Sequence, residues 1–135
     1  MARIVLTNAY VVFGSTDLSD HIASITINSS YDIVETTAFG QTAKTRVAGL
    51  VDNSVSFEFH QDYATSSVEQ TIYPLLGTAV TVAAKPVNAA TSAGNPQYSF
   101  STLISEWTPL NGAVGELATA SVTWPISGAI TKTTS

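Results

Sequence analysis

The chain lacks cysteine, long apolar runs and an abundance of charge, and each absence narrows what it can be. Without cysteine there is no disulfide framework, no thiolate nucleophile and no cysteine-based metal site. Five lysines and arginines stand against ten acids, and a net charge of −5 argues against nucleic-acid binding. No apolar run approaches the length of a membrane span, and residues 1–14 make a poor signal peptide. We therefore expect synthesis in the cytoplasm and no membrane partner.

Hydroxyl side chains supply the polar surface that charge does not. Charged residues make up 11% of the 135 residues, against about a quarter in typical globular chains. Thr occurs 19 times and Ser 16 times, which predicts β structure, here in a single domain over residues 1–135. Such a surface costs little to desolvate and suits burial in an assembly, although composition leaves a neutral-surfaced secreted domain equally open.

Alternation of apolar and polar residues predicts the strands. The clearest case is Val55, Phe57 and Phe59, which point to one side while their neighbours point to the other. Residues 22–28 alternate with Ile22 on the face opposite Ile25 and Ile27, and a second alternation follows at residues 31–36. Shorter strands are expected at residues 4–6, 9–13, 80–85, 98–104, 117–124 and 128–132.

One convincing helix interrupts the strands, within the stretch SSVEQTIYPLLG. Ser66 as N-cap and Glu69 three residues later form the pattern of a capping box, and Gly77 is the expected stop. Pro74 should distort the last turn. The apolar stripe that would lie on a sheet comprises Val68, Ile72 and either Leu75 or Leu76. We therefore predict an α+β, mainly β fold: an antiparallel β-sandwich or barrel with one short flanking helix at about residues 66–76.

No pattern in the sequence predicts an enzyme, a cofactor or a metal. His60 and Asp62 are two residues apart and would face opposite sides of a strand or straddle its end, which favours a solvent-facing histidine over a ligand. His21 is interpreted as a turn residue. The stretch GQTAKT at residues 40–45 lacks the glycine that a phosphate loop needs directly before its lysine. No G-x-S-x-G elbow exposes a serine nucleophile.

The two tryptophans favour packing over ligand stacking. Trp124 ends an alternating strand, which predicts a core or interface position. Trp107 is expected to pack under the helix or against a neighbouring subunit.

The order of motifs is the strongest indication of a family. A DLSD turn and a strand are followed by VETTAFG, then by AKTRVAGL and the strand at residues 54–60; WPISGAI closes the chain. This order resembles the tail tube (major tail) proteins of long-tailed, siphovirus-like bacteriophages over nearly the whole length. The resemblance implies a β-sandwich or barrel with a flanking helix, and homo-hexameric rings that stack into the tube conducting genomic DNA.

The resemblance also implies partners and a location. The partners would be other copies of the chain, a tape measure protein and a tail terminator, with DNA passing through without specific binding. The location would be the virion tail, after assembly in the host cytoplasm.

A long loop at about residues 37–50 has a role under this resemblance. Thr37 to Gly49 shows neither strand nor helix period, and long structureless loops in compact domains are usually functional. In the implied tube this loop reaches the adjacent ring and is ordered only by that contact; a disordered surface excursion is the alternative. The expected interface residues are Phe39, Gly40, Thr42, Lys44, Arg46, Val47 and Leu50.

The excess of acid fits a lumen that must not hold DNA, because charge of like sign prevents adhesion. The candidate lumen-facing acids are Asp32, Glu35, Glu58 and Glu116. Two other classes remain open: a head-decoration or head–tail connector (neck) protein, which would form trimers or a single ring, and a carbohydrate-binding β-sandwich module, which would need clustered exposed aromatic side chains.

Overall fold

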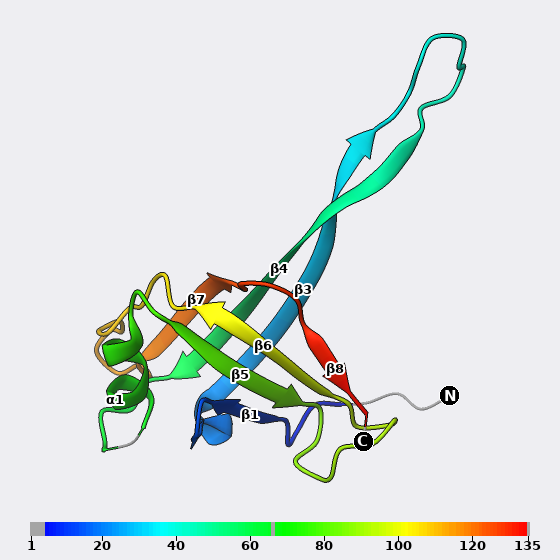
Figure 1. Ribbon diagram of the computed structural model, residues 1–135. Coiled ribbons are helices and arrows are strands. Elements are labelled where there is room, and N and C mark those ends of the chain that lie inside the picture. Colours follow the sequence, from blue (N-terminus) through cyan, green and yellow to red (C-terminus); the bar gives the residue numbers. More distant parts are fainter. Residues whose placement is uncertain (1–4, 66, 135) are drawn as a thin grey trace.

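The computed structural model describes residues 5–65 and 67–134, which fold into two antiparallel sheets with a helical segment at one end (Figure 1). The strand orders are β2-β1-β5-β6-β8 in one sheet and β3-β4-β7 in the other. The strands formed by these residues are β1 (Tyr10–Phe13), β2 (Thr16–Asp17), β3 (Ile22–Glu35), β4 (Arg46–His60), β5 (Ala79–Lys85), β6 (Gln97–Leu103), β7 (Thr119–Pro125) and β8 (Thr131–Thr133). The helical elements are η1 (Ser19–His21), α1 (Val68–Ile72) and η2 (Tyr73–Leu75). The predicted fold class is confirmed.

The core lies between the two sheets and is built around aromatic rings. Val55, Phe57 and Phe59 of β4 are all buried, as their alternation predicts. Phe13 of β1 meets them from the other sheet, with its ring centroid 5.2 Å from that of Phe57. Trp124 of β7 stands edge-on to Phe13 at 6.3 Å, an arrangement that aromatic pairs prefer. These contacts join the two sheets.

Both tryptophans bury their rings and use their ring nitrogens inside the fold. Trp124 Nε1 donates to the backbone oxygen of Glu106 over 2.7 Å, and Trp107 Nε1 donates to Glu69 Oε2 of the helix over 3.1 Å. The predicted core position of Trp124 is confirmed. Trp107 is expected from the sequence either under the helix or against a neighbouring subunit, and in the structure it packs against the helix.

A β-bulge at Ala23 changes which residues of β3 face the core. The pairing with β4 slips by one residue between Ile22 and Ser24, so Ala23 has no opposite partner. Ile22 therefore lies on the same side as Ile25 and Ile27, and all three pack against the core. The prediction that Ile22 lies on the opposite face is wrong, because it assumed that no residue was inserted.

β3 and β4 are the longest strands and form one continuous hairpin that projects from the sandwich (Figure 1). Their pairing continues outward as far as Glu35 and Arg46. The predicted division into strands at 22–28 and 31–36 is wrong, because the polar residues between them also pair with β4. The predicted loop at 37–50 is wrong from Arg46 onward, where β4 has already begun.

The helix is shorter than predicted and begins differently. Ser67 is its N-cap and makes no side-chain capping bond, while Ser66, the predicted cap, lies outside the described residues. The Glu69 side chain accepts a hydrogen bond from Trp107 and so packs with the core. After α1 the chain tightens into η2 at Pro74, as predicted, and Gly77 follows with φ of 87°. The buried residues of α1 are Val68 and Ile72.

The remaining predicted strands fall within a few residues of β1, β5, β6 and β7. The last strand begins at Thr131 instead of at residue 128. Val5 and Leu6 are not in a strand, and residue 4 lies outside the described part of the chain.

Candidate functional site

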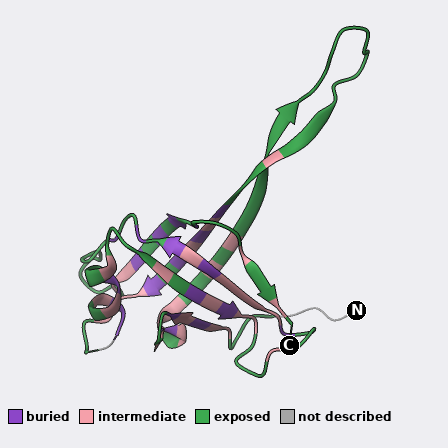
Figure 2. Ribbon diagram, in the orientation of Figure 1, coloured by how far each residue is buried: buried purple, intermediate pink, exposed green. Residues whose placement is uncertain are grey.

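The outer part of the β3–β4 hairpin, residues 30–52, is here called the arm. Every residue of the arm is described and none is buried, in contrast to the body of the sandwich (Figure 2). All the interface residues predicted from the sequence lie on it and are exposed: Phe39, Gly40, Thr42, Lys44, Arg46, Val47 and Leu50. Their role as contact residues stays a prediction.

The arm carries large apolar side chains on both of its faces. Tyr31 lies opposite Val51 on one face, and Val34 lies opposite Val47 on the other. Leu50 is 82% exposed, and the side chains of Ile33 and Phe39 also lie open to solvent. An isolated two-stranded hairpin is marginally stable in water, and apolar patches of this kind mark interaction surfaces. The arm therefore exposes apolar surface that contact with another molecule would remove from water.

The tip of the arm is closed by its own hydrogen bonds. The Thr36 amide donates to the Thr45 carbonyl over 2.8 Å, and the Thr45 amide donates to Thr37 Oγ1 over 2.9 Å. The Gln41 amide donates to the Ala38 carbonyl over 3.3 Å, and Gly40 has φ of 87°, in the region that favours glycine. Residues 36–45 contain no strand or helix, as the sequence predicts, but threonine side chains and the turn at Gly40 give them internal hydrogen bonds. That the segment is ordered only by contact with a neighbour stays a prediction.

The arm carries charges of both signs. Lys44 and Arg46 form no ion pair with any residue in the described part of the chain, although Arg46 lies opposite Glu35. Asp32 and Asp52 add two more acids along the strands. The two cations are therefore available to acids on another molecule.

The base of the arm is fixed by a buried asparagine. Asn53 is 3% exposed and donates from its side-chain nitrogen to the Gly128 carbonyl over 2.9 Å. Its backbone oxygen accepts from the Ile126 amide over 3.0 Å. Its Oδ1 finds no hydrogen-bond partner among the described residues. These bonds hold β4 against the segment after β7, so the arm leaves the body in a defined direction.

The outward face of the β3-β4-β7 sheet is rich in hydroxyl groups and poor in charge. Ser56 and Thr123 lie opposite each other there and bond through their side chains over 3.0 Å. Glu58 is exposed on the same face. The other candidate lumen acids lie elsewhere, Asp32 and Glu35 on the arm and Glu116 in the loop before β7, so the four are not brought together.

His21 joins two parts of the chain, which its interpretation as a turn residue missed. Its Nδ1 lies 2.9 Å from Asp20 Oδ1 and its Nε2 lies 2.8 Å from Asp62 Oδ2. Hydrogen bonds from the Ala64 amide and then the Ser67 hydroxyl hold the pKa of Asp62 below its ordinary value, with a smaller effect of His21. Sequence spacing pointed to His60 as the neighbour of Asp62, whereas the fold brings His21 to it from 41 positions away.

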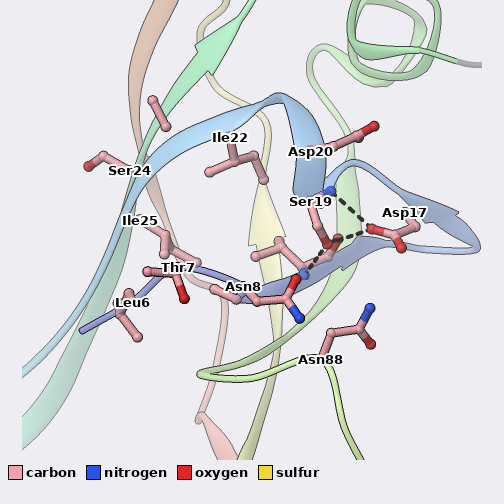
Figure 3. Close-up of a pocket in the computed structure, with 13 residues that line it drawn as sticks. Leu6, Thr7, Asn8, Asp17, Ser19, Asp20, Ile22, Ser24, Ile25 and Asn88 are labelled. Carbon is pink, nitrogen blue, oxygen red and sulfur yellow. Dashed lines mark hydrogen bonds between the residues drawn. The ribbon is translucent and has the colours of Figure 1, made fainter. Parts of the chain in front are cut away.

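A hollow of about 570 Å³ lies between the N-terminal segment and the start of β3 (Figure 3). Leu6, Thr7 and Asn8 form one wall and Ile22 to Ile25 form another. Ser19 in this hollow already exchanges hydrogen bonds with the backbone of Val11 and bonds with Asp17. Its polar groups thus hold η1 against β1 and do not converge on a ligand.

Over residues 5–65 and 67–134, no group of three or more histidine and acidic side chains is placed to hold a metal ion. In the same part of the chain, no helix has the length and hydropathy needed to cross a bilayer.

Neither a protein-family model nor a curated protein sequence matches this chain. Among solved structures, a chain of the anti-feeding prophage (AFP) baseplate, determined by cryo-electron microscopy with sixfold symmetry, has a similar fold. The TM-score is 0.58, the match covers 98% of this chain and 97% of that chain, and the sequence identity is 8%. At this identity the likeness establishes a shared fold over nearly the whole length of both chains.

Proposed function

We propose that this chain is a structural subunit of a phage-type tail, in which hexameric rings of the protein stack into a tube that conducts DNA. It acts by assembly and not by catalysis. The observation that carries the proposal is the arm, which projects from a folded body and exposes apolar side chains on both faces. The fold shared with a chain of a sixfold-symmetric baseplate supports the same class of protein.

The arm supplies the means of assembly. Its two strands cannot bury Tyr31, Ile33 or Leu50 within one copy, because residues 30–52 carry no second layer above them. Contact with neighbouring copies removes this apolar surface from water, at about 25 cal/mol per Å². The defined direction that Asn53 gives the arm lowers the entropic cost of docking, because less freedom is lost.

The hydroxyl-rich outward face of the β3-β4-β7 sheet is the proposed lining of the tube. Serine and threonine on that face hydrogen-bond water and bring no positive charge to phosphates, and Glu58 adds a negative one. DNA therefore slides past without being held. Lys85 and Lys132 belong to the other sheet, and Arg46 of β4 lies out on the arm.

A second candidate is a ring subunit of a baseplate, which forms one ring and does not stack. The specific observation that favours it is the origin of the similar structure in a baseplate. The two candidates share the use of the arm and differ in whether rings continue into a tube.

The test is assembly with and without the arm. An arm-truncated variant replaces residues 32–50 by Asn-Gly, which joins the opposed residues Tyr31 and Val51 through a two-residue hairpin turn. Sedimentation velocity at high protein concentration should show large particles for the unaltered chain and folded monomers for the variant. The Val87→Asp protein, changed at an exposed apolar residue of the body, should assemble normally. A monomeric unaltered chain, or assembly that survives truncation, would refute the proposal.

A further inference from the structure

Most of the exposed large apolar side chains lie in two groups. One is the arm. The other lies at the opposite end of β4, where the loop before β7, residues 109–118, carries Leu110, Val114 and Leu117. This loop, here called the distal loop, lies at the left of Figure 1 beside α1, while the tip of the arm lies at the upper right.

The distal loop is held in shape by the body. The Gln61 amide donates to the Ala118 carbonyl over 3.0 Å, and Tyr63 Oη donates to the Pro109 carbonyl over 2.6 Å. Asn111 Nδ2 donates to the Thr119 carbonyl over 3.2 Å. These bonds anchor both ends of the loop, so its apolar side chains are presented to solvent with little freedom left to lose on binding.

A turn at the apex of the distal loop leaves the Val114 side chain exposed to solvent. The Glu116 amide donates to the Ala113 carbonyl over 3.0 Å, and Gly115 has φ of 82°. Val114, between them, is fully exposed. The same loop also exposes Leu110 and Leu117, so it presents three large apolar side chains to solvent.

The two ends differ in charge as well as in place. Neither residues 47–84 nor residues 86–131 contain any lysine or arginine. The distal end therefore carries only negative charge from carboxylates, and exposed Glu116 bonds through its side chain to nothing in the described part of the chain. The arm carries Lys44 and Arg46, which form no ion pair with any residue that the structure describes. A guanidinium and a carboxylate brought together at such a contact form paired, charge-assisted hydrogen bonds.

The arm of one copy cannot reach the distal loop of the same copy. The strand β4 runs from Arg46 to His60, and at about 3.3 Å per residue its ends lie roughly 45 Å apart. His60 pairs with Thr119, at the root of the distal loop, so the arm and the loop lie at opposite ends of the same strand. A contact between two different surfaces of identical chains is heterologous, and such contacts form rings or filaments.

We propose that the distal loop is the docking site for the arm of a second copy, with Phe39 against Leu110 and Val114 and with Arg46 and Lys44 facing Glu116. This inference rests on the proposed function, since that function has the arm join copies, and it adds the surface that receives the arm. Each copy then gives an arm at one end and receives one at the other.

Complementation between two blocked variants tests the docking. The loop-blocked variant carries Leu110→Asp and Val114→Asp and keeps its arm; the arm-truncated variant keeps its loop. Each alone should sediment as a monomer, and a mixture should give a one-to-one heterodimer that grows no further, because one arm meets one intact loop. The Val87→Asp protein serves as the control for adding an acid to exposed apolar surface.

The inference and the proposed function are contradicted by different outcomes. If the loop-blocked variant assembles as the unaltered chain does, the arm docks elsewhere and the inference fails, while the proposed function stands. If the arm-truncated variant assembles, the proposed function fails as well. Two monomers that give no heterodimer on mixing also overturn direct docking.

A second measurement does not depend on the aspartate variants. Because the chain has no cysteine, Lys44→Cys and Glu116→Cys proteins each carry one thiol. Mild oxidation of their mixture should give a disulfide-linked dimer in at least tenfold greater yield than a mixture of Lys44→Cys with Ser56→Cys. Equal yields would contradict the docking.

Discussion

At the scale of single residues, Phe57 links the two sheets of the core. It is 2% exposed, and its ring lies between Phe13 of the other sheet and Trp124 of its own. Phe57→Ala should cost about 3–5 kcal/mol of unfolding free energy, because the sheets cannot close over the lost ring. Urea unfolding in the monomeric arm-truncated background measures this without a contribution from assembly. Leu117→Ala, at an exposed position, is the control; equal midpoints for the two variants would show that the core is elsewhere.

The stability of the fold should depend on pH through Asp62. Its pKa in the folded state lies below the ordinary value of 3.8, so the carboxylate stabilises the fold above that pH and loses this effect as pH falls through the folded pKa. Asp62→Asn should unfold at a lower urea concentration than the parent at pH 7. The gap should narrow as pH falls through the folded-state pKa of Asp62, where the carboxylate takes up its proton. A gap that stays constant across that range would contradict the assignment.

At the scale of elements, the arm and the body have different stabilities. The body has a layered core, whereas the arm is held by strand pairing and by the threonine bonds at its tip. Elements with few buried contacts open locally at low free energy. The arm of a free monomer should therefore exchange its amide hydrogens quickly although its strands are formed.

Hydrogen exchange compares the two states of the arm directly. Amides of residues 30–52 should exchange at least about tenfold more slowly in the assembly than in monomers held at low concentration, equivalent to about 1.4 kcal/mol. Core amides of β4, such as those of Phe57 and Phe59, should be protected in both states and serve as the internal control. Arm amides with unchanged protection would mean that assembly leaves the arm uncovered.

The sequence was sufficient to predict the elements whose pattern is regular. Val55, Phe57 and Phe59 alternate strictly, and they are buried as predicted. The bulge at Ala23 could not be found, because an inserted residue leaves no mark on composition. In the outer part of the hairpin, the sequence predicts the strand at residues 31–35, whereas it assigns the start of β4 at residues 46–50 to a loop because this stretch shows no regular alternation.

Of the two surfaces of the candidate site, the sequence predicted the arm but not the distal loop. The segment at the tip of the arm was recognisable in the sequence because it contains two basic residues and has neither strand nor helix periodicity. No sequence pattern indicated the distal loop, because Leu110, Val114 and Leu117 are isolated among turn residues, and the bonds from Gln61 and Tyr63 that anchor the loop come from residues distant in the sequence.

At the scale of the whole molecule, the proposed function depends on two unlike ends of one chain. The chain offers an arm with cations at one end and an acidic, apolar loop at the other, and a hydroxyl-rich sheet face between them. Apolar contact supplies most of the docking energy, since exposed ion pairs are worth little and are screened by salt. Raising the salt concentration should therefore weaken assembly modestly and not abolish it.

Cryo-electron microscopy of the assembled protein tests the proposed function most directly. We expect sixfold rings stacked into tubes, with the arm of each copy covered by neighbours and with Ser56, Glu58 and Thr123 on the inner wall. Single unstacked rings would favour the baseplate-type subunit instead. Particles without rotational symmetry, or tubes whose arms extend uncovered into solvent, would contradict assembly through the arm.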